Sequence, residues 1–358
     1  MTFRLLALPA ALAIAAAPAL PAQTPARDTL RMLFVGDMNF ARSLARDYLF
    51  AGRGEEVLGA VRGRLRAADL AVANLESMIL ERGERTDPPV SPTFAGPVQA
   101  LPLLVDAGFD AVSTANNHAW DFGRAGLLEN LEHLRYYSLS RSGTGPNVED
   151  AWRPALLHSR GWTVAVFGLT YIINHPTLTV RGTSAECCIA WADTTDAARW
   201  FRLARDSLGA DLVIATVHQG WVEYRAVPDE RTVQLFRGLV RAGADAVIGH
   251  HPHVPQGWEL VDGRPVVYSL GNFLFKQPRP WTDRGLVAEL VVPPGGGGRM
   301  TMILHPVAAG YAPRFLAGRD SAAVMAHVDA ISRRIGLPNP PARRNVAAPA
   351  PLARRTNQ

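Results

Sequence analysis

Cysteine is almost absent from this chain of 358 residues, and its two copies, Cys187 and Cys188, are neighbours. Neighbouring cysteines can pair only through a strained ring, because the geometry of a disulfide is hard to reach between them. A fold held together by several disulfides is therefore excluded, and a zinc site made by this pair alone is not expected. The sequence favours two buried cysteines that act as small hydrophobic residues, and it leaves oxidation of the pair open.

Lysine is also almost absent, since Lys276 is the only one, and arginine carries the formal net charge of +5. A positive field attracts anionic ligands such as phosphoesters or polyanionic polymers. The sequence shows no RNP motif, no zinc-finger spacing and no basic helix with interleaved aromatics. Nucleic acid is therefore not predicted as a partner, and we expect most of the charge to lie on a solvated surface.

The N-terminal apolar run, Leu5 to Ala19, is shorter than the roughly 20 residues that a membrane-spanning helix needs. Arg4 precedes this run, and the small and turn-forming residues Pro21 and Ala22 follow it. A positive start, a short apolar stretch and a small-residue exit are typical of a secretory signal peptide. We therefore expect residues 1–22 to be a signal peptide and the protein to be exported, periplasmic or extracellular. An uncleaved signal anchor is the alternative.

Short apolar runs alternate with helical stretches from Leu30 onward, in a composition of 48% hydrophobic and 19% charged residues that is typical of globular proteins. The apolar runs occupy residues 31–35, 70–73, 111–114, 163–169, 211–217, 246–249 and 265–270. Helices are expected at residues 55–67, 98–107, 123–136, 196–208 and 229–242. Near-continuous apolar strands that alternate with helices predict an α/β fold whose sheets are covered on both faces.

The pattern changes toward the C-terminus. We expect one domain over residues 30–315, a C-terminal helix over residues 316–336, and a disordered tail rich in Pro, Ala and Arg over residues 337–358. The segment PPGGGG at residues 293–298 predicts a hairpin tip or a linker.

Polar clusters follow six of the seven apolar runs directly. They occupy residues 36–42, 74–77, 116–123, 218–224, 249–253 and 269–273. In open α/β sheets, loops from several strands converge outside the carboxyl ends of those strands. We therefore expect the six clusters to form one site.

The side chains of these clusters favour a divalent metal. Carboxylate, amide and imidazole ligands suit Zn, Mn or Fe better than a metal that prefers thiolates. If two ions are bound, Glu76 is the expected bridging carboxylate. His118 stands beside a ligand position and is suited to protonate a leaving group as the general acid. The expected ligands are Asp37, Glu76, Asn117, His218, His251 and His253.

Each of these residues taken alone has a simpler explanation. Asp37 could mark a turn, Asn117 could cap a helix, and His218 could be a satisfied buried histidine. The loop at residues 249–253 is different, because three histidines within four residues rarely serve packing alone. The simpler explanations would all have to hold together for the metal site to be absent.

The motifs, in their order along the chain, resemble those of the CapA family of capsule and poly-γ-glutamate synthesis proteins, relatives of the calcineurin-like metallophosphatases. The resemblance covers about residues 31–275. It rests on a glycine–aspartate turn with a later arginine at residues 36–42, NLE at 74–76, TFAGP at 93–97, AGFD at 107–110, ANNHxxDxG at 115–123, HxGxxEY at 218–224, AGAD at 242–245, GHHPH at 249–253 and YSLGNF at 268–273.

The resemblance implies a four-layer αββα fold, in which two mixed sheets are flanked by helices. It also implies a role in making, processing or anchoring an extracellular anionic polymer, with membrane-bound biosynthesis or export partners. Arg42 would pair with a phosphate or carboxylate of the substrate. Further substrate contacts are expected from Asn74, Asn116, Asp121, Glu223, Tyr224, His250 and Asn272.

Three positions depart from the pattern. Asp37-Met38-Asn39 stands where a metallophosphatase usually has Asp-x-His, and Asn74 and Glu76 stand where Gly-Asp is usual. Gln219 replaces the tryptophan that usually follows the family's strand histidine. The loss of one histidine leaves both one ion and two ions open.

Two functions from different classes fit this sequence. The first is a metal-dependent hydrolase of a phosphoester or a γ-glutamyl amide in capsule or poly-γ-glutamate synthesis, which the intact histidine cluster favours. The second is a polymer-binding or assembly subunit that keeps the fold without turnover, which Asn39 favours. A phosphatase for unrelated exported substrates is a third hypothesis.

Overall fold

The computed structural model describes residues 27–81, 93–174, 179–296 and 300–335. The predicted signal peptide at residues 1–22 and the predicted tail at residues 337–358 lie outside the described residues, so both stay predictions. In the described part of the chain, no helix is long and apolar enough to cross a membrane.

Each of the seven apolar runs contributes a strand, and these strands belong to two sheets. The first sheet has the order β16 (Arg314–Phe315), β15 (Thr301–Ala308), β14 (Arg284–Val292), β1 (Leu30–Met38), β2 (Leu70–Leu75), β5 (Ala111–Ser113) and β6 (Ser140–Ser142), and β13 (Asn272–Leu274) also pairs with β1. The second has the order β11 (Trp258–Val261), β12 (Arg264–Val267), β10 (Ala246–His250), β9 (Leu212–His218), β8 (Trp162–Thr170) and β7 (Ala155–Ser159). Both sheets mix parallel and antiparallel pairs. A small third sheet pairs β3 (Met78–Ile79) with β4 (Ala95–Gly96).

The five expected helices are present, with ends within two residues of the prediction. They are α1 (Gly54–Leu65), α2 (Ala100–Ala107), α3 (Gly123–Tyr136), α5 (Thr194–Leu208) and α6 (Glu230–Arg241). The structure adds a π-helical turn (Ala45–Leu49), the short α4 (Val148–Trp152), a 3-10 turn (Pro294–Gly296) and α7 (Gly318–Arg334).

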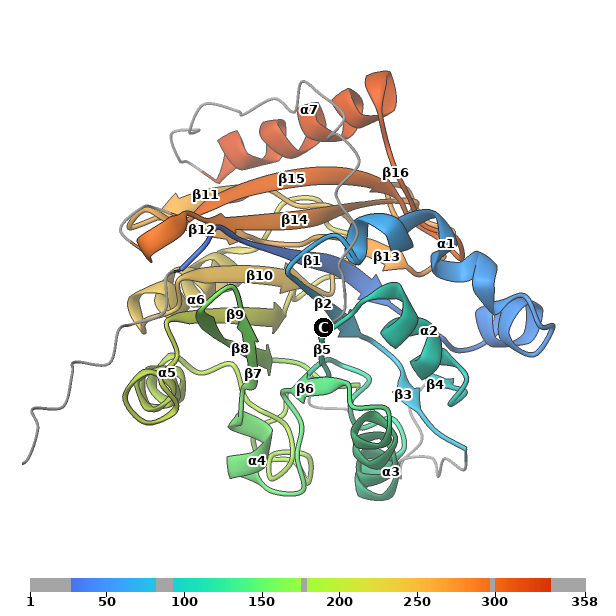
Figure 1. Ribbon diagram of the computed structural model, residues 1–358, viewed down its shortest axis with the longest axis horizontal. Coiled ribbons are helices and arrows are strands. Elements are labelled where there is room, and N and C mark those ends of the chain that lie inside the picture. Colours follow the sequence, from blue (N-terminus) through green and yellow to red (C-terminus); the bar gives the residue numbers. More distant parts are fainter. Residues whose placement is uncertain (1–26, 82–92, 175–178, 297–299, 336–358) are drawn as a thin grey trace, which may run out of the picture.

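Alternation of side chains along the strands places apolar residues on both faces of each sheet. On β1, Phe34 packs in the core between the two sheets, whereas Val35 packs against α1 and α2. On β8, Val166 joins the core between the sheets, and Phe167 packs against α5 and α6. The result is the predicted four-layer arrangement of helices, sheet, sheet and helices (Figure 1).

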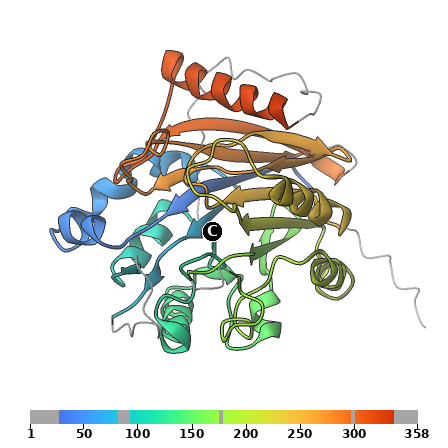
Figure 2. The ribbon, with the colours of Figure 1, turned by 180° about the vertical axis from the view of Figure 1, so that it is seen from behind.

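The strands β14 and β15 were missed by the pattern of apolar runs. They form an antiparallel pair, so the glycine-rich segment between them is a hairpin connection, one of the two predicted alternatives. The helix α7 runs along β15 in both views (Figures 1 and 2). Val324 and Val328 of α7 pack into the core between the sheets, so the helix covers that core.

The apolar run at residues 265–270 is not one strand, contrary to the prediction. β12 ends at Val267 in the second sheet, and Asn272 begins β13, which pairs with β1 in the first sheet. Gly271 makes the turn with a φ of 67°, a conformation that glycine adopts without strain. Its carbonyl oxygen accepts a hydrogen bond from the backbone nitrogen of Asp37 at 2.9 Å. The chain therefore crosses from one sheet to the other beside Asp37.

Neither cysteine forms a disulfide. Cys187 is exposed and Cys188 is buried, where Arg124 Nη1 lies 2.9 Å from its sulfur. The favoured prediction of buried, unpaired cysteines therefore holds for Cys188 and is wrong for Cys187, which is exposed.

The strands approach so closely at Gly249 that a Cβ there would lie 2.0 Å from the carbonyl oxygen of Tyr268. We expect Gly249→Ala to lower the free energy of unfolding by about 1–3 kcal/mol, because the added methyl group meets backbone. Gly59→Ala in α1 is the matched control, since nothing lies within 4 Å of that position, and it should stabilise by about 0.5–1 kcal/mol. Urea unfolding measures both; equal midpoints for Gly249→Ala and the parent would contradict the close approach.

Candidate metal centre

The predicted site residues meet at the carboxyl ends of strands from both sheets. Asp37 lies near the end of β1, Glu76 follows β2 directly, and His218 ends β9. Parallel pairing aligns Asp37 with Asn74 in the first sheet and His218 with His250 in the second. The backbone therefore brings carboxylates from one sheet beside imidazoles from the other.

Two groups of possible metal ligands share Glu76. One group consists of Glu76, His218 and His251, and the other of Asp37, Glu76 and His253. In each group, one ligand atom from every residue lies within 4.8 Å of the others. A carboxylate that belongs to both groups occupies the position of a bridging ligand between adjacent cations. The arrangement could hold one cation or two.

The carboxylate of Glu76 is the part of the cluster that most requires a cation. Glu76 is 0% exposed, and neither of its oxygens has a hydrogen-bond partner among the described residues. His253 Nε2 and His218 Nε2 lie 3.5 and 3.8 Å from Oε1. Burial, together with the negative charge of Asp37, raises the pKa of Glu76 well above its ordinary value. Buried charged groups are stable when they are paired or coordinate a metal, so this orphaned carboxylate fits a divalent cation.

Asp37 differs from Glu76 because it has several partners. Asn74 Nδ2 donates a hydrogen bond to Oδ1 at 2.8 Å, and the backbone nitrogen of His251 donates to Oδ2 at 3.3 Å. His250 Nδ1 and His253 Nδ1 each lie 3.2 Å from a carboxylate oxygen. Burial alone would raise the pKa of Asp37, but the contacts with His250 and His253 lower it well below the ordinary value. Asp37 is therefore ionised and held in one orientation.

Two of the imidazoles are buried against each other. His218 Nε2 and His251 Nδ1 lie 3.1 Å apart. Burial and the neighbouring His251 lower the pKa of His218 well below its ordinary value, and burial with His253 lowers the pKa of His251 to about 4. Both rings are therefore neutral at pH 7, which is the form that binds a metal.

The loop after β10 holds its histidines through an unusual backbone. His251 has a φ of 98° and His253 a φ of 59°. Positive φ values are uncommon for residues other than glycine and cluster at functional sites. This backbone places the two rings with their centroids 6.0 Å apart, both facing the carboxylates.

His118 contacts the cluster from the loop after β5. Its Nδ1 lies 2.7 Å from Asp121 Oδ2, and its Nε2 lies 3.9 Å from Glu76 Oε1. The ring of Phe94 packs against it at a tilt, with centroids 4.1 Å apart, and the backbone nitrogen of Phe94 donates to Asp121 Oδ2 at 2.7 Å. Asp121, predicted to contact substrate, is therefore placed to orient His118.

Asparagine side chains orient the histidines around the carboxylates. Asn117 Oδ1 lies 2.9 Å from His218 Nε2, and Asn272 Oδ1 lies 3.0 Å from His253 Nδ1. The predicted ligand Asn117 thus contacts a histidine of the cluster, to which it could also add a ligand oxygen.

Asn74 and Asn116 join the first two loops. Asn116 Nδ2 donates to the carbonyl oxygen of Leu75 at 2.8 Å, and its Oδ1 accepts from the backbone nitrogen of His118 at 3.1 Å. Asn74 Nδ2 lies 3.1 Å from His218 Nδ1, in addition to its contact with Asp37. Both side chains were predicted to bind substrate. In the structure they form hydrogen bonds that join the loops of the site.

Three predicted substrate residues lie at the rim of the cluster. Arg42 and Glu223 are exposed, and Tyr224 is half-buried. The guanidinium of Arg42 stands 4.8 Å from the ring centroid of Phe94, and the ring of Tyr224 lies 5.9 Å from that of His253. This position leaves the three side chains available to a ligand.

Asn174, Phe275 and Gln277 were missed from the sequence. Asn174 Oδ1 accepts from Asn117 Nδ2 at 3.1 Å, and Gln277 Nε2 donates to the hydroxyl of Tyr224 at 3.1 Å. Phe275 packs between His253 and Phe94. Asn174 lies after the apolar run at residues 163–169, the one run after which no polar cluster had been recognised, and the other two lie shortly after the YSLGNF motif.

Asn39 stands where a histidine is usual, and its side chain serves the local turn. Its Oδ1 accepts a hydrogen bond from the backbone nitrogen of Ala41 at 2.8 Å. Its Nδ2 is buried and has no hydrogen-bond partner within the described part of the chain.

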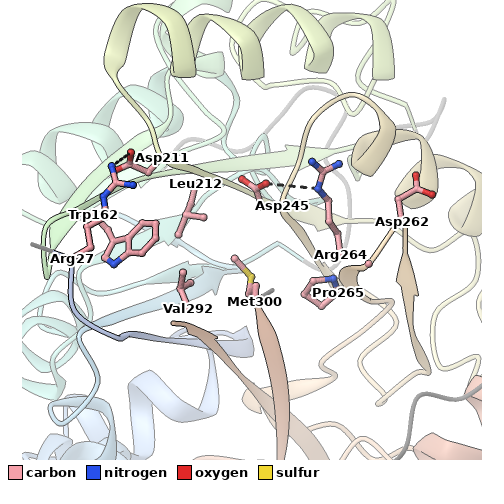
Figure 3. Close-up of a pocket in the computed structure, with 11 residues that line it drawn as sticks. Arg27, Trp162, Asp211, Leu212, Asp245, Asp262, Arg264, Pro265, Val292 and Met300 are labelled. Atoms are coloured by element: carbon pink, nitrogen blue, oxygen red, sulfur yellow. Dashed lines mark hydrogen bonds and ion pairs between the residues drawn. The ribbon is translucent and has the colours of Figure 1, made fainter. Parts of the chain in front are cut away.

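A separate pocket of about 380 Å³ lies at the other ends of the parallel strands (Figure 3). Trp162, at the start of β8, lines it. Its guanidiniums face carboxylates, since Arg27 pairs with Asp211 and Arg264 Nε lies 3.7 Å from Asp245 Oδ1. Because these charges are already paired, the pocket is not the candidate site.

The model of the family described as bacterial capsule synthesis protein PGA_cap matches residues 31–277. The chain belongs to this family. It is similar to the PGA biosynthesis protein CapA of Bacillus subtilis, with 28% identity over 279 residues that cover 77% of this chain and 71% of that one. It is also similar to the capsule biosynthesis protein CapA of Bacillus anthracis, with 26% identity, 73% of this chain and 63% of that one.

A probable polyglutamine synthesis accessory protein of Mycobacterium tuberculosis is 27% identical over 228 residues, which cover 58% of this chain and 55% of that one. These matches confirm the resemblance to CapA. The chain is thus a member of a family of capsule and poly-glutamate synthesis proteins with a metallophosphatase-like fold.

Stability of the metal-free protein should depend on pH through His251. Its pKa is about 4 in the folded chain against an ordinary 6.5, so the unfolded chain binds more protons between these values. Stability is therefore expected to fall as pH decreases from about 6.5 to about 4, and His251→Gln should flatten that slope. Urea unfolding of chelator-treated protein measures it, with His158→Gln, at an exposed position, as the control. Identical slopes for the two variants would refute the burial of a neutral His251.

Substitution of Glu76 by glutamine should stabilise the metal-free protein and should reduce the stabilisation that a bound metal gives. Glu76→Gln is expected to stabilise the chelator-treated protein by about 1 kcal/mol, because it removes a buried ionisable group without a partner. The parent should gain about 2.7 kcal/mol from Mn²⁺ or Zn²⁺ at a hundredfold excess over Kd, and the variant should lose most of this gain. Glu132→Gln, at an exposed position of α3, is the control. Equal metal-induced stabilisation of both variants would rule out Glu76 as a ligand.

Proposed function

We propose that the protein is a metal-dependent hydrolase of capsule or poly-γ-glutamate synthesis, which acts outside the cytoplasm on a phosphoester or a γ-glutamyl amide. The observation that carries the proposal is the buried carboxylate of Glu76, which has no hydrogen-bond partner in the described structure and belongs to both ligand groups. The setting comes from the relatives, whose names refer to capsule and PGA biosynthesis. Export rests on the predicted signal peptide, and membrane-bound biosynthesis or export partners are proposed with it.

The ligand set favours Zn, Mn or Fe, because it combines carboxylates with imidazoles. A divalent cation held by Asp37, Glu76, His218, His251 and His253 would polarise a substrate oxygen and lower the pKa of water. The neighbouring Asn74, Asn117 and Asn272 hold the ligand side chains in place.

His118 is the proposed general acid. Asp121 occupies its Nδ1, so Nε2 is the ring nitrogen directed toward Glu76. A proton held on Nε2 is placed to pass to the leaving oxygen or nitrogen of a substrate that lies over the cluster. The ring of Phe94 packs against the imidazole at a tilt of 38°, and the His118 side chain is buried.

Arg42 is the proposed contact for an acidic group of the substrate. Its exposed guanidinium presents a planar set of donors that matches a carboxylate or phosphate. Glu223 and Tyr224, on the opposite side of the rim, are the proposed contacts for the remainder of the substrate.

A polymer-binding or assembly subunit without turnover is the second candidate. Asn39 favours it. This asparagine stands at a position where a metallophosphatase usually has a histidine, and its side chain is hydrogen-bonded to the local backbone. In that function the cluster would bind a cation for structural reasons or as a bridge to the polymer.

Turnover of bis-p-nitrophenyl phosphate and of a γ-glutamyl p-nitroanilide, measured together with metal content, separates the two functions. His118→Ala is expected to lower kcat by about 10²–10⁴-fold with unchanged metal content, because it removes only the proton donor. His251→Ala should lower metal content as well as turnover. His158→Ala is the control and should change neither. Stoichiometric metal without turnover on either compound in the parent protein would favour the assembly subunit.

A further inference from the structure

Five rings form a continuous border along one side of the metal centre. The ring of His118 packs against that of Phe94 with centroids 4.1 Å apart, and Phe94 meets Phe275 at 5.6 Å. Phe275 in turn meets His253 at 5.1 Å, and His253 meets Tyr224 at 5.9 Å. We call this row of rings the aromatic border. It joins loops from both sheets and includes two histidines of the centre.

An arginine stands on a ring near each end of the aromatic border. The guanidinium of Arg42 lies 4.8 Å from the centroid of Phe94, and that of Arg279 lies 5.7 Å from the centroid of Tyr224. Both arginines are exposed, and neither guanidinium forms an ion pair with a described residue. Many other arginines of the chain do pair with carboxylates, as Arg160 does with Asp69. Beside the metal centre, Arg42 and Arg279 thus offer two exposed guanidiniums without an ion pair to the described residues, as Arg231 does away from the centre.

The supports of the two guanidiniums are fixed in place. Arg42 itself has a φ of 57° and Tyr224 has a φ of 61°, which for side chains other than glycine is strained backbone. The hydroxyl of Tyr224 accepts a hydrogen bond from Gln277 Nε2, and its backbone nitrogen donates to Pro252 at 2.9 Å. A guanidinium on a fixed ring keeps its planar set of donors directed to solvent, and it is weakly hydrated. Both properties favour capture of a carboxylate or phosphate.

We propose that Arg42 and Arg279 form a two-ended clamp that holds an extended polyanion across the metal centre. The proposal rests on the assignment of an anionic polymer as the ligand. One acidic group would pair with each guanidinium, and the intervening unit would lie over Glu76. The two arginines stand on different rings of the border, Arg42 on Phe94 and Arg279 on Tyr224. A chain with repeated acidic groups can engage both, and the second contact then forms at a high effective concentration. The clamp therefore selects for ligand length as well as charge.

Binding of fluorescein-labelled poly-γ-glutamate, compared with that of γ-triglutamate, tests the clamp at several salt concentrations. Arg279→Gln should weaken polymer binding by about 10-fold or more, since it removes one charge-assisted contact. Arg42→Gln should do the same, and the double variant should lose the preference for the long chain. Arg279→Lys should restore only part of the affinity, because lysine keeps the charge without the planar set of donors.

Arg231→Gln is the matched control. Arg231 is exposed and stands 5.5 Å from the ring centroid of Trp221, which is not part of the aromatic border. This variant loses the same charge and the same kind of ring contact, and its polymer affinity should equal that of the parent. Polymer binding by Arg279→Gln that equals binding by Arg231→Gln would overturn the clamp, and so would a parent protein that does not bind the polymer.

The clamp and the hydrolase can fail separately. If the parent protein shows no turnover but Arg279→Gln still weakens polymer binding, the clamp stands and the hydrolase does not. If the parent turns over and Arg279→Gln binds like Arg231→Gln, the hydrolase stands and the clamp does not. Metal content of Arg279→Gln, read beside circular dichroism, shows that the loss of affinity does not arise from loss of the centre.

Discussion

Negative charge enclosed away from water is the constraint on which the centre depends. Glu76 and Asp37 are both fully buried, and only Asp37 has hydrogen-bond donors. The neighbouring His218 and His251 cannot neutralise the pair at pH 7, because burial lowers the pKa of each ring. Without a cation, the cost of burying this charge appears as the raised pKa of Glu76, which favours its protonated form. A divalent cation removes this cost, and the same neutral rings that fail as counter-ions are suited to bind it.

The two sheets are joined in a way that builds this enclosure. The chain passes from β12 in the second sheet to β13 in the first, and Gly271 lets it turn beside Asp37. Gly36 and Gly249 have backbone carbonyl groups where a Cβ would lie, at 2.1 and 2.0 Å, so both sheets meet there without intervening side chains. Strand ends from different sheets thus approach closely enough for carboxylates of one to face imidazoles of the other. The packing of the two sheets sets the distance between these carboxylates and imidazoles, and the ends of the strands and the loops after them carry the side chains.

The sequence predicts the strands and the meeting of polar clusters well, because near-continuous apolar runs and the residues that follow them are local signals. It does not predict that the run at residues 265–270 leaves its strand after Val267, because that depends on tertiary contacts. It also does not predict that Asp121 contacts His118, although the two residues are only three apart. The sequence also does not predict Asn174 as part of the site. This residue lies four residues beyond the end of β8 and reaches the centre only through the packing of its loop. Arg279 gives no signal in the sequence, since its role follows from the ring on which it stands.

The energetic cost of the buried carboxylates and of the strained loop bears on whether the protein is a hydrolase or a subunit that only binds a polymer. A subunit that only held a polyanion would need the exposed arginines beside the aromatic border. Buried negative charge near these arginines would weaken their attraction for the polyanion. Retention of Glu76 without a hydrogen bond, and of strained backbone at His251 and His253, reduces stability unless something is gained at the same place. A bound cation reverses the sign of the local charge and turns the centre into a place that attracts an anionic group. Under the two proposals above, the buried carboxylates would hold the cation and the exposed guanidiniums would hold the polymer beside it.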